Sequence, residues 1–292
     1  MKLCLACRKP FESRDWVCPR CGHRPLEQNN RLFFAPDSSE SNSGFDIALF
    51  SSLAAIEEKN FWYRTRNRLL VWSLKKYFPD ARTFFEVGCG TGFVLKGFSE
   101  SFDRLGLSGC ELYSRALDFA SQRAPRAQLF QMDARQLPFE GEFEVAGAFD
   151  VLEHVEEDTK VLAQMHQALK PGGGILLTVP QHPFLWSAYD EQDHHVRRYR
   201  SSELKKKVEN AGFDVIRTTS FVCALLPAMA LSRLAVRKKD PDFNVMTDFI
   251  TESPMNTAFK KILDVERALI RLGVSLPFGG SLLLVGRKRA GL

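Results

Sequence analysis

The feature that most constrains the fold is a repeated alternation of short apolar segments with amphipathic segments in the middle of the chain. The apolar segments that we predict as strands are residues 83–88, 104–112, 127–134, 143–150 and 174–180. The segments that we predict as helices lie between them, at residues 92–102, 114–124 and 155–170, and the last is stopped by Pro171 and the glycines after it. Strands that alternate with helices form a parallel, doubly wound sheet with helices on both faces, so the sequence predicts an α/β fold. Ligands in such sheets bind beyond the carboxyl ends of the strands.

A glycine-rich turn follows the first of these strands, in the stretch EVGCGTGFVL at residues 86–95. Gly88, Gly90 and Gly92 occupy alternate positions, and the acid Glu86 stands two residues before the first glycine. This G-x-G-x-G spacing differs from the G-x-G-x-x-G fingerprint of dinucleotide sites. A glycine turn between a strand and a helix indicates that a nucleotide approaches the backbone there, and the alternative is a tight turn without a ligand.

Acidic residues end the next three predicted strands. Glu111, followed by Leu112, ends the second strand, and Asp150 ends the fourth. The third strand ends in Asp133 and Ala134. A carboxylate at the second strand can accept hydrogen bonds from two ribose hydroxyls, and a carboxylate with a backbone N–H at the third can bind the amino group and ring of an adenine. Together these residues favour an adenosyl ligand at this edge of the sheet.

The stretch from Glu86 to Pro180 resembles the class I S-adenosylmethionine-dependent methyltransferase family, and the resemblance covers roughly residues 60–292. It implies a seven-stranded, Rossmann-like sheet whose last strand is antiparallel, with residues 213–221 and 280–288 as strands six and seven. It also implies S-adenosyl-L-methionine as the cofactor. By this resemblance the residues at the cofactor are Glu86, Gly88, Gly90 and Gly92 at the methionine part, Glu111 and Leu112 at the ribose, Asp133 and Ala134 at the adenine, and Asp150 beside the same crevice.

The segment NFWYRTRNRLL at residues 60–70 precedes the sheet and joins an aromatic cluster to several arginines. Such a helix could cover the cofactor, with Trp62 over it and Arg64 on its carboxylate. The alternative is a packed amphipathic helix with a solvated basic face.

Methyl transfer from a sulfonium needs positioning and exclusion of water more than it needs a catalytic triad. A base is required only when the acceptor arrives protonated. The stretch DVLEHV at residues 150–155 offers His154 for this role. It resembles the corresponding stretch of ubiquinone-pathway O-methyltransferases, which implies that Asp150, Glu153 and His154 could hold a divalent cation. The alternative is a capping box, because Asp150 and Glu153 have D-x-x-E spacing.

A second candidate for substrate contacts is the loop DEQDHHVRRYRSSEL at residues 190–204, after the fifth strand. We expect His195 and Arg198 to be its functional members, since a cation there could bind a carboxylate or phosphate of the substrate. The alternative is a polar loop that leads into a helix capped by Ser201.

The N-terminal segment contains two C-x-x-C pairs, formed by Cys4 with Cys7 and by Cys18 with Cys21. Two such pairs can complete the tetrahedral thiolate site that structural zinc prefers, so the spacing predicts a zinc ribbon. Two disulfides are the alternative, which the expected reducing compartment disfavours.

We expect a zinc ribbon at residues 1–30, a linker at residues 31–45 and a methyltransferase domain at residues 46–292. A helical insertion is predicted at residues 222–279, before the last strand. Its first part, residues 222–239, is apolar and then basic, which suits a helix packed on the domain, a cover for an apolar substrate, or peripheral contact with a membrane.

The net charge of +5 is mildly basic and is too small to indicate nucleic-acid binding by itself. The absence of a leader-like apolar segment predicts a cytoplasmic protein. The expected function is S-adenosylmethionine-dependent O- or C-methylation of a small molecule, with lipid-linked and quinone-like acceptors as candidates. The alternatives are a methyltransferase of RNA or protein recruited through the ribbon, and an inactive cofactor-binding module.

Overall fold

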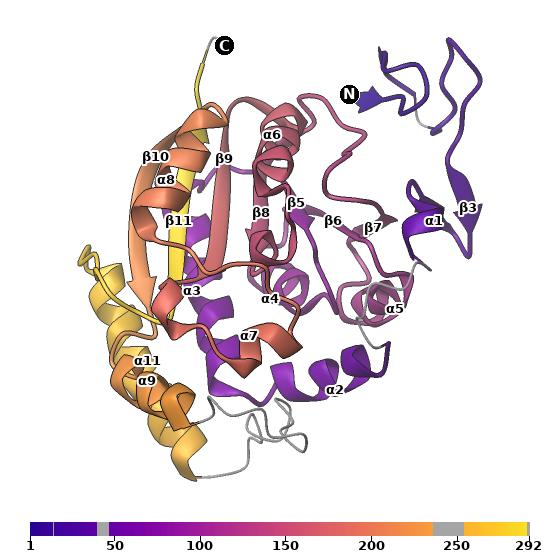
Figure 1. The fold of residues 1–292 in the computed structure, drawn as a ribbon. Coiled ribbons are helices and arrows are strands. Elements are labelled where there is room, and N and C mark those ends of the chain that lie inside the picture. The colour runs from indigo at the N-terminus through magenta and orange to yellow at the C-terminus, as the bar shows by residue number, and fades with distance from the viewer. Residues whose placement is uncertain (14, 40–46, 236–253, 291–292) are drawn as a thin grey trace.

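The computed structural model describes residues 1–13, 15–39, 47–235 and 254–290. The chain begins with a small two-stranded sheet of β1 (Lys2–Leu3) and β2 (Pro10–Phe11). All other described strands join one large sheet, which Figure 1 shows as the centre of the molecule.

The large sheet has nine strands in the order β10-β11-β9-β8-β5-β6-β7-β4-β3. Its strands are β3 (Leu26–Gln28), β4 (Arg31–Phe33), β5 (Thr83–Val87), β6 (Gly106–Glu111), β7 (Gln128–Gln131), β8 (Phe143–Phe149), β9 (Leu169–Pro180), β10 (Phe213–Phe221) and β11 (Ser281–Lys288). The pairs from β9 through β8, β5, β6 and β7 to β4 are parallel, and β11 is antiparallel to both of its neighbours. The predicted mainly parallel α/β sheet is therefore confirmed.

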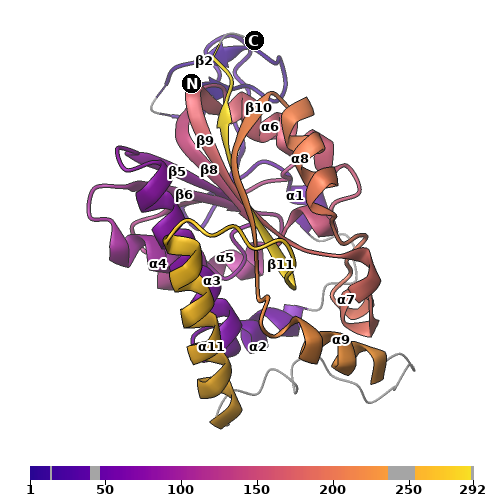
Figure 2. The same ribbon diagram turned by 90° about the vertical axis from the view of Figure 1, so that its left-hand side faces the viewer.

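Helices cover both faces of the sheet (Figure 2). One face carries α3 (Phe61–Tyr77), α4 (Phe93–Ser101), α5 (Ser114–Arg123) and α11 (Pro254–Arg271), and the other carries α6 (Asp158–Ala168) and α8 (Ser201–Asn210). Each face has its own apolar core. On the first face Leu70 and Leu95 are completely buried, and on the second face Leu162 and Leu204 are completely buried.

Further helices gather where the parallel strands end. They are α2 (Ile47–Glu57), η1 (Leu152–His154), η2 (Pro183–Leu185), α7 (Ala188–Gln192) and α9 (Leu226–Ala235). Figures 1 and 2 place α2, α7 and α9 along the same lower edge of the sheet. This edge carries the glycine turn and the acidic strand ends, so these helices border the expected cofactor site.

The strand count differs from the predicted seven because the N-terminal segment contributes β3 and β4 to the sheet. The segment predicted as a linker, residues 31–45, begins with regular structure, since it contains β4 and α1 (Pro36–Ser39). Residues 40–46 lie outside the described part. The helix that was predicted to stop at Pro171 ends at Ala168, because Leu169 already pairs with Phe143 in the sheet.

The insertion predicted for residues 222–279 contains α9 and α11, while residues 236–253 lie outside the described part. Helix α11 packs against α3, where the rings of Phe61 and Phe259 have centroids 5.3 Å apart and Arg68 pairs with Asp264 at 3.2 Å. Among the described helices, none is long and apolar enough to cross a bilayer.

Candidate functional site

The glycine turn after β5 has all three of its glycines at positive φ. A Cβ atom at Gly92 (φ +79°) would lie 2.7 Å from the Cα atom of Ala120, so this glycine allows α4 to start against α5. A Cβ atom at Gly90 (φ +50°) would meet nothing within 4 Å. The backbone at Gly90 therefore faces open space, as a backbone that is approached by a ligand must.

Glu111 connects this turn to the end of β6. Its carboxylate accepts hydrogen bonds from the backbone N–H groups of Gly90 (3.0 Å), Leu112 (2.7 Å) and Tyr113 (3.2 Å). Burial raises the pKa of Glu111, and the three N–H groups act in the opposite direction. The sequence-predicted residues Gly90, Glu111 and Leu112 thus come together in one hydrogen-bonded cluster.

Glu86 lies on the same side of the sheet and is only 2% exposed. Among the described residues its Oε2 atom has no hydrogen-bond partner, and burial raises the pKa of this carboxyl well above the usual range. A buried polar atom without a partner is costly, so such an atom beside an open glycine turn fits a ligand that donates a hydrogen bond or carries an ammonium group.

Asp133 and Ala134 follow β7 as predicted, but the Asp133 carboxylate already has a partner. The backbone N–H of Arg135 donates to it at 2.8 Å, and the Arg135 guanidinium pairs with it at 2.7 Å. Although burial acts against the charged form, these bonds lower the pKa of Asp133. The Arg135 side chain is 40% exposed. Ala134 is half-buried against the core.

Asp150, at the end of β8, pairs with the guanidinium of Arg66 and accepts a hydrogen bond from the Thr178 hydroxyl at 2.9 Å. The same guanidinium lies over the Trp62 ring, 4.6 Å from its centroid, and over the Tyr63 ring at 5.5 Å. Helix α3 therefore reaches the end of β8 through Arg66, which the sequence reasoning did not select, and Trp62 packs against the same guanidinium. The four-residue spacing of Trp62 and Arg66 places both on one helix face and could have identified the second residue.

Arg64, in contrast, lines an open basic depression between α3, α4 and α11. Its cationic companions there are Arg68, Lys75, Lys96, Arg267 and Arg271. The structure thus groups Arg64 with these cations and brings Arg66 to the acidic end of β8 instead.

His154 and His195 come from distant segments and meet beside Glu153. Their rings have centroids 4.7 Å apart in an edge-to-face arrangement. One ligand atom from each of Glu153, His154 and His195 lies within 4.8 Å of the others, close enough to share a cation. The set that the structure brings together thus contains His195 in place of Asp150.

The two histidines have opposite charge states near neutral pH. Burial lowers the pKa of His154 to about 4. Burial also disfavours the charged form of His195, but hydrogen bonds to Asp190 (2.9 Å) and Asp193 (3.1 Å) outweigh it and raise the pKa of His195 to about 10. His195 is consequently a cation and cannot act as a base near pH 7, whereas His154 is neutral.

The capping box considered for Asp150 and Glu153 is wrong, because η1 begins without a side-chain cap. The Glu153 side chain is fully buried, and neither of its carboxylate oxygens has a hydrogen-bond partner among the described residues. Burial raises the pKa of Glu153 well above its ordinary value. The cap considered for Ser201 is also wrong, since α8 starts after Arg200 with no side-chain cap.

Arg198 was predicted to bind substrate, and the structure assigns its guanidinium to the protein itself. It pairs with Asp190 at 2.7 Å and donates to the carbonyl oxygens of Gln181 (3.0 Å) and Gly280 (3.1 Å). Arg198 is 5% exposed. These bonds hold the loop after β9 against the start of β11. A guanidinium with these partners has few N–H groups left to donate to a ligand.

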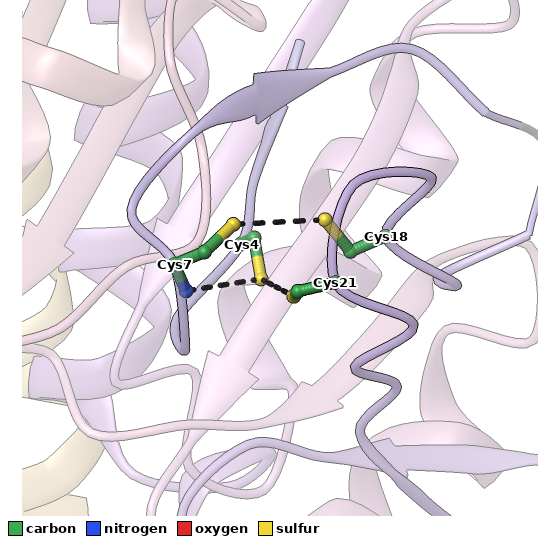
Figure 3. A group of neighbouring side chains, drawn as sticks. All are labelled: Cys4, Cys7, Cys18 and Cys21. Carbon is green, nitrogen blue, oxygen red and sulfur yellow. Dashed lines mark hydrogen bonds between the residues drawn. The ribbon is translucent and has the colours of Figure 1, made fainter.

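The four N-terminal cysteines converge as predicted (Figure 3). The sulfur atoms of Cys4 and Cys21 are 3.6 Å apart, and those of Cys7 and Cys18 are 3.7 Å apart. These separations are far too long for disulfides, and all four thiols are free. Thiolates about 2.3 Å from a tetrahedral zinc ion would lie about 3.8 Å from one another, so the donor set fits a zinc ion.

Comparisons with known proteins bear on the whole arrangement. A family model described as a methyltransferase domain matches residues 56–218. A Mycolicibacterium smegmatis protein named an S-adenosylmethionine-dependent methyltransferase is 23% identical over 56% of this chain and 63% of its own length. The ubiquinone biosynthesis O-methyltransferase of Pseudomonas paraeruginosa is 27% identical over 46% of this chain and 65% of its own length. The chain thus spans less than two thirds of each of these relatives.

Two solved structures share the fold. The phosphoethanolamine N-methyltransferase 2 of Haemonchus contortus, in complex with S-adenosyl-L-methionine, has a TM-score of 0.57 at 18% identity, over 85% of this chain and 58% of that one. A complex between the Haloferax volcanii Trm112 methyltransferase activator and a methyltransferase has a TM-score of 0.53 at 18% identity, over 83% of this chain and 97% of that one. Since the family model matches more than half of the 292 residues, the chain belongs to the methyltransferase domain family.

Proposed function

We propose that the protein is an S-adenosylmethionine-dependent methyltransferase that acts on a small molecule. The observation that carries this proposal is the cluster of Gly90, Glu111 and Glu86: an open glycine backbone, a carboxylate at the neighbouring strand end and a buried carboxyl oxygen that has no hydrogen-bond partner in the described part of the chain. Membership of the methyltransferase domain family supports it.

The residues at the strand ends would divide the cofactor between them. Glu111 would accept hydrogen bonds from the ribose hydroxyls, Asp133 and the Ala134 N–H would bind the adenine, and Glu86 would face the ammonium group of the methionine part. The cofactor supplies an already activated methyl group on a positively charged sulfur. The chain's contribution is therefore to orient the two reactants and to exclude water.

Trp62 and Arg66 would cover the methionine end of this site. The Arg66 guanidinium lies between the Trp62 ring and the Asp150 carboxylate, and Arg66 is only 7% exposed. A cation held in this way could bind the cofactor carboxylate in place of Asp150 when the cofactor enters.

His154 is the residue that we propose as the proton acceptor when the acceptor group arrives protonated. It is neutral near pH 7, because its pKa lies near 4, so its ring can take a hydrogen bond from a hydroxyl. His195 would lie beside it as a fixed cation. Since both of its N–H groups are bonded to Asp190 and Asp193, it would favour negative charge on the acceptor oxygen only through its positive charge and not by a hydrogen bond.

The acceptor that we propose is a small molecule methylated at oxygen or carbon, with lipid-linked and quinone-like molecules as the first to test. Relatives named for ubiquinone biosynthesis and for malonyl-[acyl-carrier protein] O-methylation support this choice. Peripheral membrane contact through residues 222–239 stays a prediction, and its last four residues lie outside the described part.

The second candidate is recruitment of RNA or protein through the N-terminal cysteine segment. The ribbon is packed on the sheet through Trp16, whose ring lies 5.6 Å from that of Phe139. A module held against the domain in this way is better suited to stabilising it than to reaching out for a macromolecule. We therefore place a structural zinc ion at Cys4, Cys7, Cys18 and Cys21 and give the small molecule priority.

The test is isothermal titration calorimetry of the full chain with S-adenosylhomocysteine and, separately, with NAD⁺. We expect binding of one S-adenosylhomocysteine per chain and no measurable heat with NAD⁺. Binding of NAD⁺ without S-adenosylhomocysteine would overturn the proposal. Incubation of the ligand-free protein with radiolabelled S-adenosylmethionine and with quinol, phospholipid or RNA extracts would then separate the acceptor classes. Cofactor binding without methyl transfer to any of these extracts would favour the inactive module.

A further inference from the structure

The N-terminal segment extends the methyltransferase sheet at the strand that precedes the expected adenine site. Strand β4 runs parallel to β7, with Leu32 opposite Phe130 and Phe33 opposite Gln131. Figure 1 shows this segment along the right-hand edge of the sheet, beyond β7. Asp133 follows β7 by two residues, so any displacement of β7 would move the proposed adenine contact.

Gln131, at the end of β7, ties this edge to the ribose side of the site. It is completely buried. Its Nε2 atom donates to the carbonyl oxygens of Ala35 (2.8 Å) and Leu112 (2.9 Å), while its Oε1 atom accepts from the Ala35 N–H at 3.0 Å. One carboxamide thereby joins the N-terminal segment to the residue that follows Glu111.

Arg31 makes a second connection from β4. Its guanidinium donates to the carbonyl oxygens of Ser114 (3.3 Å) and Leu117 (3.1 Å) and pairs with Asp118 at 3.1 Å. Ser114 is the first residue of α5, directly after the turn that carries the N–H groups bound by Glu111. Arg31 therefore holds the far end of the same turn.

The segment that holds the cysteine cluster also packs against this edge of the sheet. Trp16 lies two residues before the second cysteine pair. Its ring packs against the rings of Phe34 and Phe130, with centroid separations of 4.7 Å and 5.8 Å. The Leu3 N–H donates to the Pro138 carbonyl oxygen at 2.8 Å. The ribbon and the β3–β4 hairpin thus form one body with the edge of the sheet.

We propose that residues 1–35 are a built-in positioning element for the adenosine site, acting through Gln131 and Arg31 on the Glu111–Tyr113 turn. This inference rests on the proposed function. The competing explanation is that the segment only shields the edge of β7 from solvent and from other chains, as edge strands require. The two explanations differ in one measurable respect: only a positioning role makes cofactor affinity fall in variants that remain folded.

The experiment compares full-length variants by the dissociation constant for S-adenosylhomocysteine and by the thermal midpoint from circular dichroism. Gln131→Met removes both polar groups of the carboxamide, and Arg31→Ala removes the connection to α5. The controls are Gln128→Met, an exposed glutamine on the same strand, and Arg24→Ala, an exposed arginine of the same segment whose ion pair is with Glu27.

We expect each test variant to bind S-adenosylhomocysteine about tenfold more weakly, which corresponds to about 1.4 kcal/mol, while both controls keep the wild-type affinity. Unchanged affinity in folded Gln131→Met and Arg31→Ala proteins would overturn the inference. Should Gln131→Met fail to fold, Arg31→Ala decides, because it removes a contact near the surface. If the wild-type chain does not bind the ligand at all, the proposed function fails, and that result is distinct from a failure of the positioning role.

Discussion

The imidazole rings of His154 and His195 lie edge to face, 4.7 Å between centroids, and burial and hydrogen bonding drive their protonation in opposite directions. The first ring comes from η1 and the second from the loop before α8. Their contact supplies a neutral proton acceptor beside a fixed cation at one edge of the sheet.

The opposite charge states predict two widely separated histidine titrations. In heteronuclear NMR spectra of the full chain, the signal of His154 should titrate near pH 4 and that of His195 near pH 10. Assignment follows from the His154→Gln and His195→Gln spectra, each of which should lack one of the two signals. Two signals that both titrate between pH 6 and 7 would contradict the arrangement.

The raised pKa of His195 also predicts how stability depends on pH. Between the unfolded pKa of about 6.5 and the folded value of about 10, the native state holds a proton that the unfolded chain lacks. The contribution of His195 to the free energy of unfolding is therefore complete below pH 6.5. It is lost as pH rises toward 10, with a slope of at most about 1.4 kcal/mol per pH unit. Urea unfolding of wild type and His195→Gln at several pH values should show the difference in free energy shrinking toward pH 10.

Replacement of Glu111 should have a larger effect on the free energy of cofactor binding than on the free energy of unfolding. Glu111→Ala removes the acceptor for three backbone N–H groups and, under the proposed function, for the ribose hydroxyls. We expect affinity for S-adenosylhomocysteine to fall by at least about a hundredfold, equivalent to about 2.7 kcal/mol. The exposed Glu100, changed to Ala, is the matched control. Wild-type affinity in Glu111→Ala would place the ribose elsewhere.

Two glycines of the same turn should respond differently to alanine. Gly92→Ala brings a Cβ atom within 2.7 Å of the Ala120 backbone, so we expect it to lower the free energy of unfolding by about 1–3 kcal/mol or more. Gly90→Ala meets open space and carries only the strain of its positive φ, but it fills space that the proposed cofactor would occupy. Its main effect should be weaker S-adenosylhomocysteine binding. Chemical denaturation and calorimetry of both variants distinguish these outcomes.

The cysteine cluster predicts one zinc ion per chain. Elemental analysis of the purified protein should find this ion, and Cys18→Ser should lose it, whereas Cys223→Ser, outside the cluster, should keep it. Chelation should lower the thermal midpoint, because a cluster this small has little apolar core of its own: Cys4, Phe11 and Cys18 are its buried apolar members. A protein that is metal-free and equally stable would contradict a structural zinc ion.

Local patterns were sufficient for the sheet and for much of the site. The apolar runs and glycine turn identify β5 to β9, and the acids that end these strands identify Glu111 and Asp133, because side chains at the carboxyl ends of parallel strands share one edge. Cysteine spacing likewise identifies the four sulfurs of the cluster, since two short loops bring them together with little help from the rest of the chain.

The sequence by itself thus determined the α/β fold, the strand-end carboxylates and the cysteine cluster, because each depends on residues close together in the chain. Only the tertiary structure decided that Arg66 rather than Arg64 joins Asp150, that Arg198 holds a loop, and that β4 extends the sheet at β7. The physical reason is that charge pairing and strand pairing between distant segments depend on which surfaces the folded core brings into contact. The spacing within α3 places Arg66 on the face of Trp62, but it does not select Asp150 as the partner.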